Sequence, residues 1–285
     1  MSVKLELQNV SYYYGKGTAF EVKALDNVNF KVESGSITGL IGHTGSGKST
    51  LAMLFNGLEK PYEGKVLLDG CDIWDKKYKG GRICFRVGLV MQYPEYQLFE
   101  ETVFDDIAFG PRNMGLDADQ VKQRVENAVA FVGLSHDILE QSPFDLSGGQ
   151  KRRVAIAGIM AMQPEMLVLD EPAAGLDPAG RADIFGGIRR YRDTTGATVL
   201  IVSHSMEDMA EYCDDIIVMH RGKVMMAGPK NEIFADSQSL SQAGLDIPQI
   251  TRVMIELSKN RLDVNTAACT EEQALAELCK VFNLK

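Results

Sequence analysis

Short runs of hydrophobic residues along the chain predict buried strands separated by helices. The uniformly apolar runs, typical of parallel strands covered on both faces, are residues 37–41, 87–91, 166–169 and 198–202. Apolar residues at helical spacing occur in residues 121–132 and 147–162. This alternation predicts an α/β fold with a mostly parallel core sheet. Antiparallel strands are expected from the segment up to about Phe30 and from residues 65–68 and 216–226, with a hairpin turn at 220–222.

The pattern changes after about Phe234, where residues 235–239 are expected to form a linker. A helix is then predicted from the spacing of Ile250, Val253, Met254 and Leu257. A second helix is predicted to begin at a capping box of Thr270 and Gln273. Its expected apolar face is Ala274, Leu275, Leu278, Val281 and Phe282. Two such short helices cannot bury both apolar faces alone, so they are expected to pack on the main domain or on another chain.

Composition narrows the class of protein. Of the 285 residues, 45% are hydrophobic and 24% are charged, as in ordinary globular proteins. The net charge of −9 disfavours nucleic acid as a partner, because phosphate backbones are bound by excess Lys and Arg. No apolar run approaches the roughly 18 residues of a membrane span, and the N-terminal sequence MSVKLELQNV lacks a signal-peptide core. We therefore expect a protein that stays on the cytosolic side, and its five scattered cysteines fit reduced thiols.

The strongest chemical signal is GHTGSGKS at residues 42–49, which fits the phosphate-binding pattern G-x-x-x-x-G-K-[ST]. In such a loop the backbone N–H groups point at phosphate oxygens. Lys48 would neutralise the β and γ phosphates, and the Ser49 hydroxyl would hold Mg²⁺. A glycine-rich turn without a ligand is the alternative, disfavoured by the strand before it and the helix after it. The candidate ATP-binding residues here are Gly42, His43, Thr44, Gly45, Ser46, Gly47, Lys48 and Ser49.

Two further segments carry candidate chemistry. The apolar run 166–169 ends in Asp170 and Glu171, and a strand parallel to that of the phosphate loop would place both carboxylates beside the phosphates. Asp170 could then hold Mg²⁺, and Glu171 could take a proton from an attacking water. The sequence LSGGQ at 146–150 precedes a long helix, whose N-terminal N–H groups could bind an anion. A plain serine N-cap is the alternative for that segment.

Taken in order, these motifs resemble those of the ATP-binding cassette (ABC) ATPase family. The matching features are the phosphate loop, Gln92, LSGGQ, the Asp-Glu strand end, Gly175-Leu176-Asp177 and His204. The resemblance covers roughly residues 3 to 230 and implies a P-loop NTPase fold of the ABC type. Such a fold has an antiparallel β subdomain and a helical subdomain beside the core sheet. Here residues 1–235 would be the ABC ATPase domain, with the helical subdomain at about 92–162, and residues 236–285 a small C-terminal helical extension.

The resemblance also assigns roles to single residues. Tyr14 would stack on adenine, although the adjacent Tyr12 and Tyr13 could be core residues instead. Thr50 would reach phosphate, and Gln92 would join Mg²⁺ and the nucleophilic water. His204 would contact the γ-phosphate, and Glu171 would be the catalytic base. The expected cofactors are therefore ATP and Mg²⁺.

In this family the LSGGQ element completes the site of a facing subunit, so the resemblance implies a pair of chains arranged head to tail. The residues acting in trans would be Ser147, Gly148, Gly149 and Gln150. Asp177 would lie where the two chains touch. ATP would hold the pair closed, and hydrolysis would release it.

The acidic and apolar segment 91–111 is expected to be a docking surface for a helix of a membrane subunit. Its negative charge comes from Glu95, Glu100, Glu101, Asp105 and Asp106, and its apolar anchors would be Tyr96, Leu98, Phe99 and Val103. Carboxylates pair well with arginine, so an arginine-bearing helix would suit this surface. The alternative is a solvated acidic loop.

Three longer stretches resemble the ATPase subunits of energy-coupling factor (ECF) transporters, which take up vitamins or metal ions. They are QYPEYQLFEETVFDDIAFGPRNMGL, LSGGQKRRVAIAGIMA and DEPAAGLDP. Residues 245–251 also resemble the ECF C-terminal extension, which helps to join two ATPase subunits. The resemblance implies a peripheral protein on the cytoplasmic face of the membrane. Its partners would be a transmembrane scaffold, a substrate-binding membrane subunit and another ATPase subunit. Within the group the chain resembles the second of two ATPase paralogues that pair as a heterodimer; a homodimer stays open.

Several other functions can be compared with that of an ECF ATPase subunit. The most similar alternative is an ATPase subunit of another ABC importer type. A DNA-maintenance ATPase would need a long coiled coil between the phosphate loop and LSGGQ, and no heptads occur there. A ribosome-associated ABC protein would carry two cassettes. A binding-only pseudoenzyme is disfavoured because Lys48, Asp170, Glu171 and His204 are all present. Ala173-Ala174, where the family often has Thr-Ser or Thr-Ala, gives no reason to infer lost activity.

Overall fold

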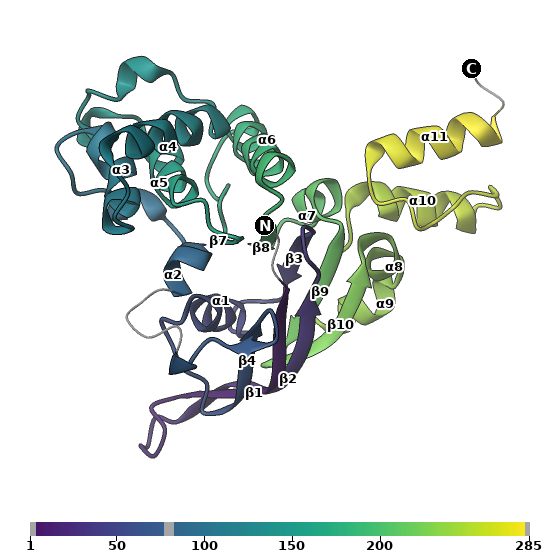
Figure 1. Cartoon of the computed structure of the whole chain (residues 1–285). Coiled ribbons are helices and arrows are strands. Elements are labelled where there is room, and N and C mark those ends of the chain that lie inside the picture. The colour runs from purple at the N-terminus through teal and green to yellow at the C-terminus, as the bar shows by residue number, and fades with distance from the viewer. Residues whose placement is uncertain (1–3, 77–82, 283–285) are drawn as a thin grey trace.

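The computed structural model describes residues 4–76 and 83–282. A six-stranded sheet with the order β10-β9-β3-β8-β7-β6 forms the centre of the molecule (Figure 1). Its strands are β3 (Ile37–Ile41), β6 (Val87–Val90), β7 (Met166–Asp170), β8 (Thr198–Val202), β9 (Asp215–His220) and β10 (Lys223–Pro229). Strands β3, β7 and β8 are fully buried, as their uniformly apolar sequences predict.

The strand directions confirm the expected parallel core and correct one expectation. Strand β9 pairs parallel to β3, although residues 216–226 were expected to be antiparallel throughout; only β10 is antiparallel. The hairpin between β9 and β10 turns where predicted, with positive φ at Arg221 and Gly222. The carboxyl ends of the parallel strands therefore lie together at one edge of the sheet, where ligands bind in such folds.

A second, antiparallel sheet has the order β2-β1-β4-β5. Its strands are β1 (Leu5–Tyr14), β2 (Val22–Val32), β4 (Glu63–Leu68) and β5 (Cys71–Asp72). Its apolar face and helix α1 (Lys48–Asn56) belong to one buried cluster, which includes Leu7, Val66 and Phe55. The Asp26 N–H donates to the Gly222 carbonyl and so joins this sheet to the β9–β10 turn.

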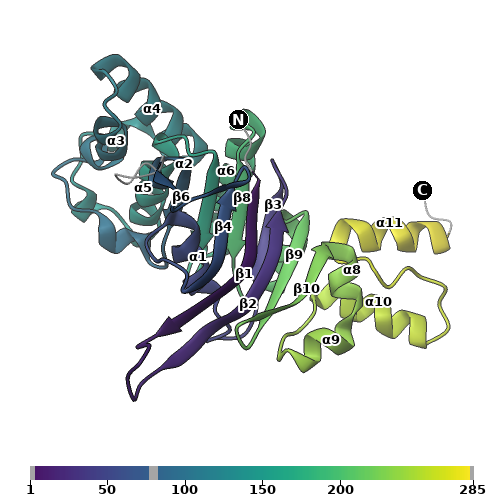
Figure 2. The same cartoon turned by 60° about the horizontal axis from the view of Figure 1, so that its bottom comes forward.

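Helices form a separate layer at one side of the core sheet (Figures 1 and 2). This layer contains α3 (Val103–Asn113), α4 (Ala118–Phe131) and α5 (Gly148–Ala161), with the short elements α2 (Ile83–Arg86), η2 (Pro94–Gln97), η3 (His136–Ile138) and η4 (Pro143–Asp145). Capping boxes start α4 at Asp117 and α5 at Ser147. Helices α6 (Pro178–Thr195) and α7 (Met206–Tyr212) follow strands β7 and β8.

The C-terminal segment is more helical than its sequence predicts. Its helices are α8 (Lys230–Ala235), α9 (Ser237–Gln242), α10 (Gln249–Lys259) and α11 (Glu271–Val281). The expected linker at 235–239 is wrong: the Asp236 carboxylate accepts from the Ser239 N–H and caps α9. Helix α10 is confirmed.

The start of α11 is confirmed, but its predicted capping box is only half formed. Thr270 caps the helix, whereas the Gln273 amide oxygen accepts from the Cys269 N–H instead of from Thr270. Two members of its predicted apolar face point outward, since Leu275 is 64% and Phe282 54% exposed.

Helices α10 and α11 share a small apolar cluster of their own around Met254, Val264, Ala268 and Ala274. In both views they project from the body beyond α8 (Figures 1 and 2). Among the described residues, no helix is long and apolar enough to cross a membrane.

Candidate nucleotide-binding site

A cavity of about 820 Å³ lies at the carboxyl edge of the core sheet. It brings together predicted residues from five separate segments: Tyr14, Gly42, His43, Thr44, Gly45, Gly47, Lys48, Ser49, Thr50, Gln92, Asp170, Glu171 and His204. Five lining residues were missed by sequence reasoning, namely Val22, Lys23, Ala24, Gly244 and Leu245. Leu245 begins the segment 245–251 that resembles the ECF extension, but no sequence signal placed it or the other four at the cavity.

The phosphate loop connects the end of β3 to the start of α1 without a side-chain cap. Gly47 has φ 104°, a conformation that favours glycine. A Cβ there would lie 2.7 Å from the Leu25 Cδ2 and 2.8 Å from the Ala24 carbonyl oxygen. The β2 backbone therefore presses against the loop and fixes the N-terminus of α1 in place.

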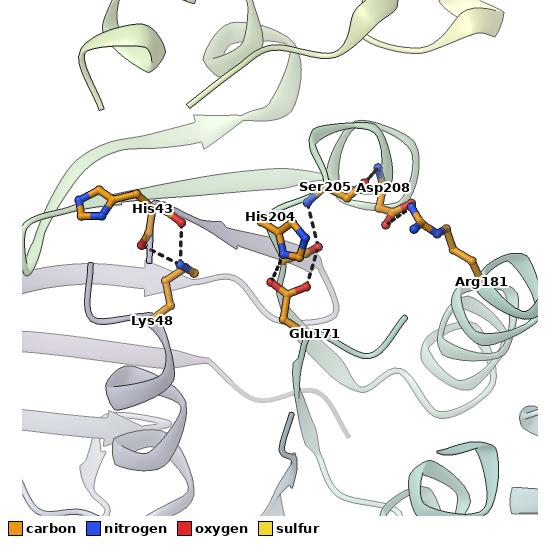
Figure 3. A network of polar contacts seen from close by, with 9 residues as sticks. His43, Lys48, Glu171, Arg181, His204, Ser205 and Asp208 are labelled. Atoms are coloured by element: carbon orange, nitrogen blue, oxygen red, sulfur yellow. Dashed lines mark hydrogen bonds and ion pairs between the residues drawn. The ribbon is translucent and has the colours of Figure 1, made fainter. Parts of the chain in front are cut away.

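Lys48 lies over this loop. Its ammonium group donates to the carbonyl oxygens of Gly42 at 2.6 Å and His43 at 3.1 Å (Figure 3). Burial lowers the pKa of Lys48, while the charges of Glu171 and Asp170 act in the opposite direction. The cation is thus held near two carboxylates, and its two carbonyl partners are the contacts that phosphate oxygens of a nucleotide could replace.

Ser46 differs from the other predicted phosphate-loop residues. Its side chain is fully buried and does not line the cavity, and its hydroxyl has no hydrogen-bond partner among the described residues. Its N–H donates to the His43 carbonyl at 3.1 Å, within the loop itself. In this structure, then, Ser46 fills the space beneath the loop instead of presenting its side chain to a ligand.

Asp170 ends β7 and is almost fully buried. Burial raises its pKa, while a hydrogen bond from Ser49 and the charge of Lys48 oppose that shift. A hydroxyl beside a carboxylate is a donor set that suits Mg²⁺, which typically takes one or two carboxylates together with substrate phosphates. No group of three or more His, Cys, Asp or Glu within the described ranges could hold a metal by itself.

Glu171 is held from two sides (Figure 3). The His204 Nδ1 lies 2.8 Å from its Oε1, and the Ser203 hydroxyl donates to its Oε2 at 3.4 Å. The Glu171 N–H donates to the Val202 carbonyl, and its φ of 53° is a left-handed conformation uncommon for a non-glycine residue. Sequence reasoning missed Ser203, although its position directly before His204 was a usable signal. The arrangement fixes one carboxylate at the cavity wall, as a general base requires.

The three adjacent tyrosines of β1 have different surroundings. Tyr12 is buried and donates to the Glu59 carboxylate at 2.6 Å, whereas Tyr14 is 42% exposed and lines the cavity. The Tyr14 hydroxyl lies 3.0 Å from that of Thr50. Tyr14 is therefore the tyrosine placed to contact an adenine base. The Thr50 hydroxyl is within hydrogen-bond distance of the Tyr14 hydroxyl.

Two residues of LSGGQ, Ser147 and Gly149, line a different cavity from the phosphate loop, whereas the predicted Gly148 and Gln150 do not line it. This second cavity, of about 350 Å³, is bounded by Ser147, Gly149, Arg153, Gly175, Leu176, Asp177, Ala179, Gly180 and Asp183. Ser147 caps α5, and the Gln150 amide oxygen accepts from the Ser147 N–H at 3.0 Å. Asp177 caps α6 by accepting from the Gly180 N–H at 2.8 Å. In one chain, the LSGGQ segment and the phosphate loop therefore lie in two separate cavities.

The predicted docking segment borders a groove of about 460 Å³. The groove is lined by Cys84, Phe85, Gln97, Leu98, Phe99, Asp106, Phe109, Gly110, Asn113, Val154, Ala155, Gly158, Ile159 and Met162. Of the predicted docking residues Tyr96, Phe99, Glu100, Glu101 and Asp105, only Phe99 lines it. Phe109, which sequence reasoning missed, packs edge-to-face on Phe99 with ring centroids 5.0 Å apart.

Three residues of that segment are buried or already paired. Val103 is fully buried, so it cannot serve as the surface anchor that was expected. Glu95 accepts from the buried Arg152 at 2.7 and 3.0 Å, and Arg152 also donates to the Ala174 carbonyl. The Asp105 carboxylate accepts from the Thr102 hydroxyl, at the N-cap of α3, and from Arg112. The free negative charge of the segment is therefore smaller than its sequence suggests.

Comparisons with known proteins agree with this geometry. The family described as "ABC transporter" matches residues 25–174. The "Energy-coupling factor transporter ATP-binding protein EcfA2" of Caldanaerobacter subterraneus subsp. tengcongensis is 50% identical over 270 residues, 95% of this chain and 94% of that protein. The protein of the same name from Clostridium tetani is 48% identical, over 100% of this chain and 99% of that protein.

Solved structures show the same fold. CbiO1 from Clostridium perfringens, described as part of the ABC transporter complex cbiONQ, has a TM-score of 0.74 and 35% identity, covering 90% of this chain and 96% of that one. A dimeric post-hydrolysis state of the ATP-binding cassette MJ0796, bound to ADP and Pi, has a TM-score of 0.70 and 26% identity, covering 79% of this chain and 98% of that one. This chain belongs to the ABC transporter family and, within it, to the energy-coupling factor transporter ATP-binding proteins.

Proposed function

We propose that this chain hydrolyses ATP as one of two ATPase subunits of an ECF-type importer. The importer would take up a vitamin or metal ion through a transmembrane scaffold and a substrate-binding membrane subunit. The observation that carries the proposal is the single cavity that joins Lys48, Asp170 and the Glu171–His204 pair. Its place at the carboxyl edge of a parallel sheet is where such folds bind nucleotides.

Each wall of the cavity has a part in binding. Tyr14 offers a ring for the adenine, and the phosphate loop with the first turn of α1 offers N–H groups to the phosphates. Lys48 can exchange its two carbonyl partners for phosphate oxygens. Ser49, Asp170 and Gln92 would hold Mg²⁺, which when bound would neutralise charge on the phosphates.

Glu171 accepts the proton of the attacking water. The left-handed backbone and the contacts to His204 and Ser203 restrict where its carboxylate can point. The His204 ring is 76% exposed, so its other edge can also contact the γ-phosphate. A base held in one position contributes on the order of a hundredfold or more to such a proton transfer.

A facing subunit completes the site. The separation of the two cavities in one chain supports this step, because Ser147 and Gly149 line a different cavity from the phosphate loop of their own chain. They would instead present N–H groups to the nucleotide held by the partner. We infer a heterodimer with a second ATPase paralogue, in which Asp177 lies at the contact.

The membrane scaffold would dock in the groove beside Phe99 and Phe109. The groove has an apolar floor from α3 and α5, and Asp106 lies on its wall, which suits a helix carrying apolar and basic side chains. Tyr96, Glu100 and Glu101 would contact that helix at the rim of the groove, whereas the carboxylate of Asp105 is already paired with Arg112. This docking would hold the protein peripherally at the cytoplasmic face of the membrane.

The test of the proposed reaction is Glu171→Gln. The amide keeps the size of the side chain but cannot accept the proton, so we expect ATP hydrolysis to fall at least about a hundredfold while ATP binding persists. Hydrolysis is measured by phosphate release from the assembled complex, and binding by titration with a fluorescent ATP analogue. Glu140→Gln, at an exposed carboxylate outside the cavity, is the matched control. Unchanged turnover in Glu171→Gln would reject Glu171 as the base.

A further inference from the structure

An ion pair joins the helix that follows the Asp177 loop to the helix that follows His204 (Figure 3). The Arg181 Nη1 donates to both oxygens of Asp208, at 3.2 and 3.1 Å. Asp208 is only 7% exposed, so its charge needs this partner. Arg181 and Asp208 lie 27 residues apart in sequence and belong to none of the family's motifs.

Each end of the pair is rigidly joined to a functional loop. On α6, the Arg181 N–H donates to the Asp177 carbonyl at 3.0 Å, and the Asp177 side chain caps the same turn. On α7, the Asp208 N–H donates to the Ser205 hydroxyl at 3.2 Å, and Ser205 directly follows His204. The ion pair therefore fixes the distance between the first turns of two helices.

A short chain of contacts continues from α7 to the base. The Ser205 N–H donates to the Ser203 hydroxyl at 3.1 Å, and that hydroxyl donates to Glu171. His204, between these two serines, holds the other oxygen of the same carboxylate. A displacement of the first turn of α7 would consequently reach Glu171 through both of its side-chain partners.

We propose that Arg181 and Asp208 are positioning residues, which transmit the placement of Asp177 to His204 and Glu171. This inference rests on the proposed function, in which Asp177 lies against the facing subunit. When the two chains close, the Asp177 loop moves as one body with Arg181, and the ion pair draws the start of α7 to the position in which Glu171 is aligned. Hydrolysis is thereby tied to the presence of a seated partner.

The matched control is a second contact between the same two helices. Arg189, two turns along α6, donates to the Glu211 carbonyl at 3.2 Å near the other end of α7. It ties α6 to α7 as Arg181 does, but away from Asp177 and His204. If α6–α7 packing alone matters, removing either arginine should have the same effect.

The experiment uses the complex purified with its second ATPase subunit and membrane subunits, assayed with Mg²⁺ and ATP. For Arg181→Ala we expect kcat to fall about tenfold, the scale of coupling through a packed element. KM for ATP should be unchanged, because neither residue lines the nucleotide cavity. Arg181→Lys should restore most of kcat, and Arg189→Ala should match the unmodified complex.

A double-mutant cycle tests whether the pair acts as a unit. Asp208→Asn keeps the shape of the side chain and one hydrogen-bond acceptor, so the variant should still fold. We expect this substitution to lower kcat. The double variant with Arg181→Ala should have a kcat no lower than that of Arg181→Ala alone. Normal kcat in a folded Arg181→Ala complex, or an equal loss in Arg189→Ala, would overturn the inference. If Glu171→Gln abolishes hydrolysis in the same preparation, the proposed function stands and only the positioning role has failed.

Discussion

Glu171 shows how a single residue can be made ready for chemistry by its backbone. Its φ of 53° is a left-handed conformation at the end of β7, and both carboxylates line the cavity, Asp170 beside Ser49 and Glu171 beside His204. A left-handed conformation at a non-glycine residue costs roughly 1–3 kcal/mol and persists only where the surroundings enforce it. Adjacent carboxylates thereby receive different environments, which suits the different roles proposed for them.

Tyr14 gives a prediction at the same scale. Tyr14→Ala should weaken ATP binding by about 1–3 kcal/mol, the usual effect of removing an aromatic ring from beneath a base. Tyr14→Phe should bind ATP normally, because it keeps the ring and loses only the contact with the Thr50 hydroxyl. Fluorescence titration with an ATP analogue measures both variants. Equal ATP affinity in the unmodified protein and in Tyr14→Ala would show that the Tyr14 ring takes no part in ATP binding.

Which residues line the nucleotide cavity was largely readable from the sequence, but the direction of individual side chains was not. Glycine, lysine and serine at fixed spacing identify a phosphate loop because the backbone conformation needs those residue types. The motif assigns Ser49 a hydroxyl that faces the ligand, but it does not say where the side chain of Ser46, at a variable position, points; the structure buries Ser46 and places Ser49 in the cavity wall. The ion pair of Arg181 and Asp208 was likewise invisible, since it joins two helices whose packing only the fold determines.

At the scale of elements, the groove between α3 and α5 is the feature most open to test. Phe109→Ser should weaken association with the membrane scaffold at least about tenfold, because interface aromatics commonly contribute more than 1 kcal/mol. ATP affinity should not change, since Phe109 does not line the nucleotide cavity. Co-purification from membranes in mild detergent measures the loss.

Phe20→Ser is the control for that experiment. Phe20 is an exposed phenylalanine between β1 and β2 and lies outside the groove. A similar loss of co-purification in both variants would mean that exposed aromatic area in general, and not this groove, holds the scaffold. Reversing Glu100 and Glu101 to Lys then separates the contribution of the rim from that of the apolar floor.

Elements with strong periodicity were predictable, and short ones were not. The apolar runs of β3, β7 and β8 and the capped helix α5 follow from local sequence. Strand β9 looked like half of a simple hairpin, yet its other edge pairs parallel to β3, a non-local contact that the local pattern cannot reveal. The polar residues after Ala235 read as a linker because α9 is only six residues long and depends on packing of Leu240 into the main core.

At the scale of the whole molecule, the C-terminal helices α10 and α11 expose apolar side chains that a partner could cover. Val253 on α10 and Leu275 on α11 are 49% and 64% exposed on an appendage whose own core is small. We expect Val253→Asp or Leu275→Asp to weaken pairing with the second ATPase subunit by about tenfold or more, as for other buried apolar contacts. Light scattering of the two purified subunits measures the pairing.

Lys259→Asp, at an exposed polar position of the same appendage, should leave the pairing unchanged. Pairing that is unaffected in both aspartate variants would assign the association to the ATPase domain alone. These substitutions are preferable to truncation after Phe234, because Leu240, Ala243 and Ile247 belong to the main core. Removing them would test folding instead of assembly.

The separation of the two cavities has a consequence for ATP consumption by unpaired subunits. If LSGGQ acts on the nucleotide of a facing subunit, as proposed, an unpaired copy holds two incomplete half-sites and would not hydrolyse ATP. Turnover per copy should then collapse on dilution, and an imbalance in the synthesis of the subunits would be harmless.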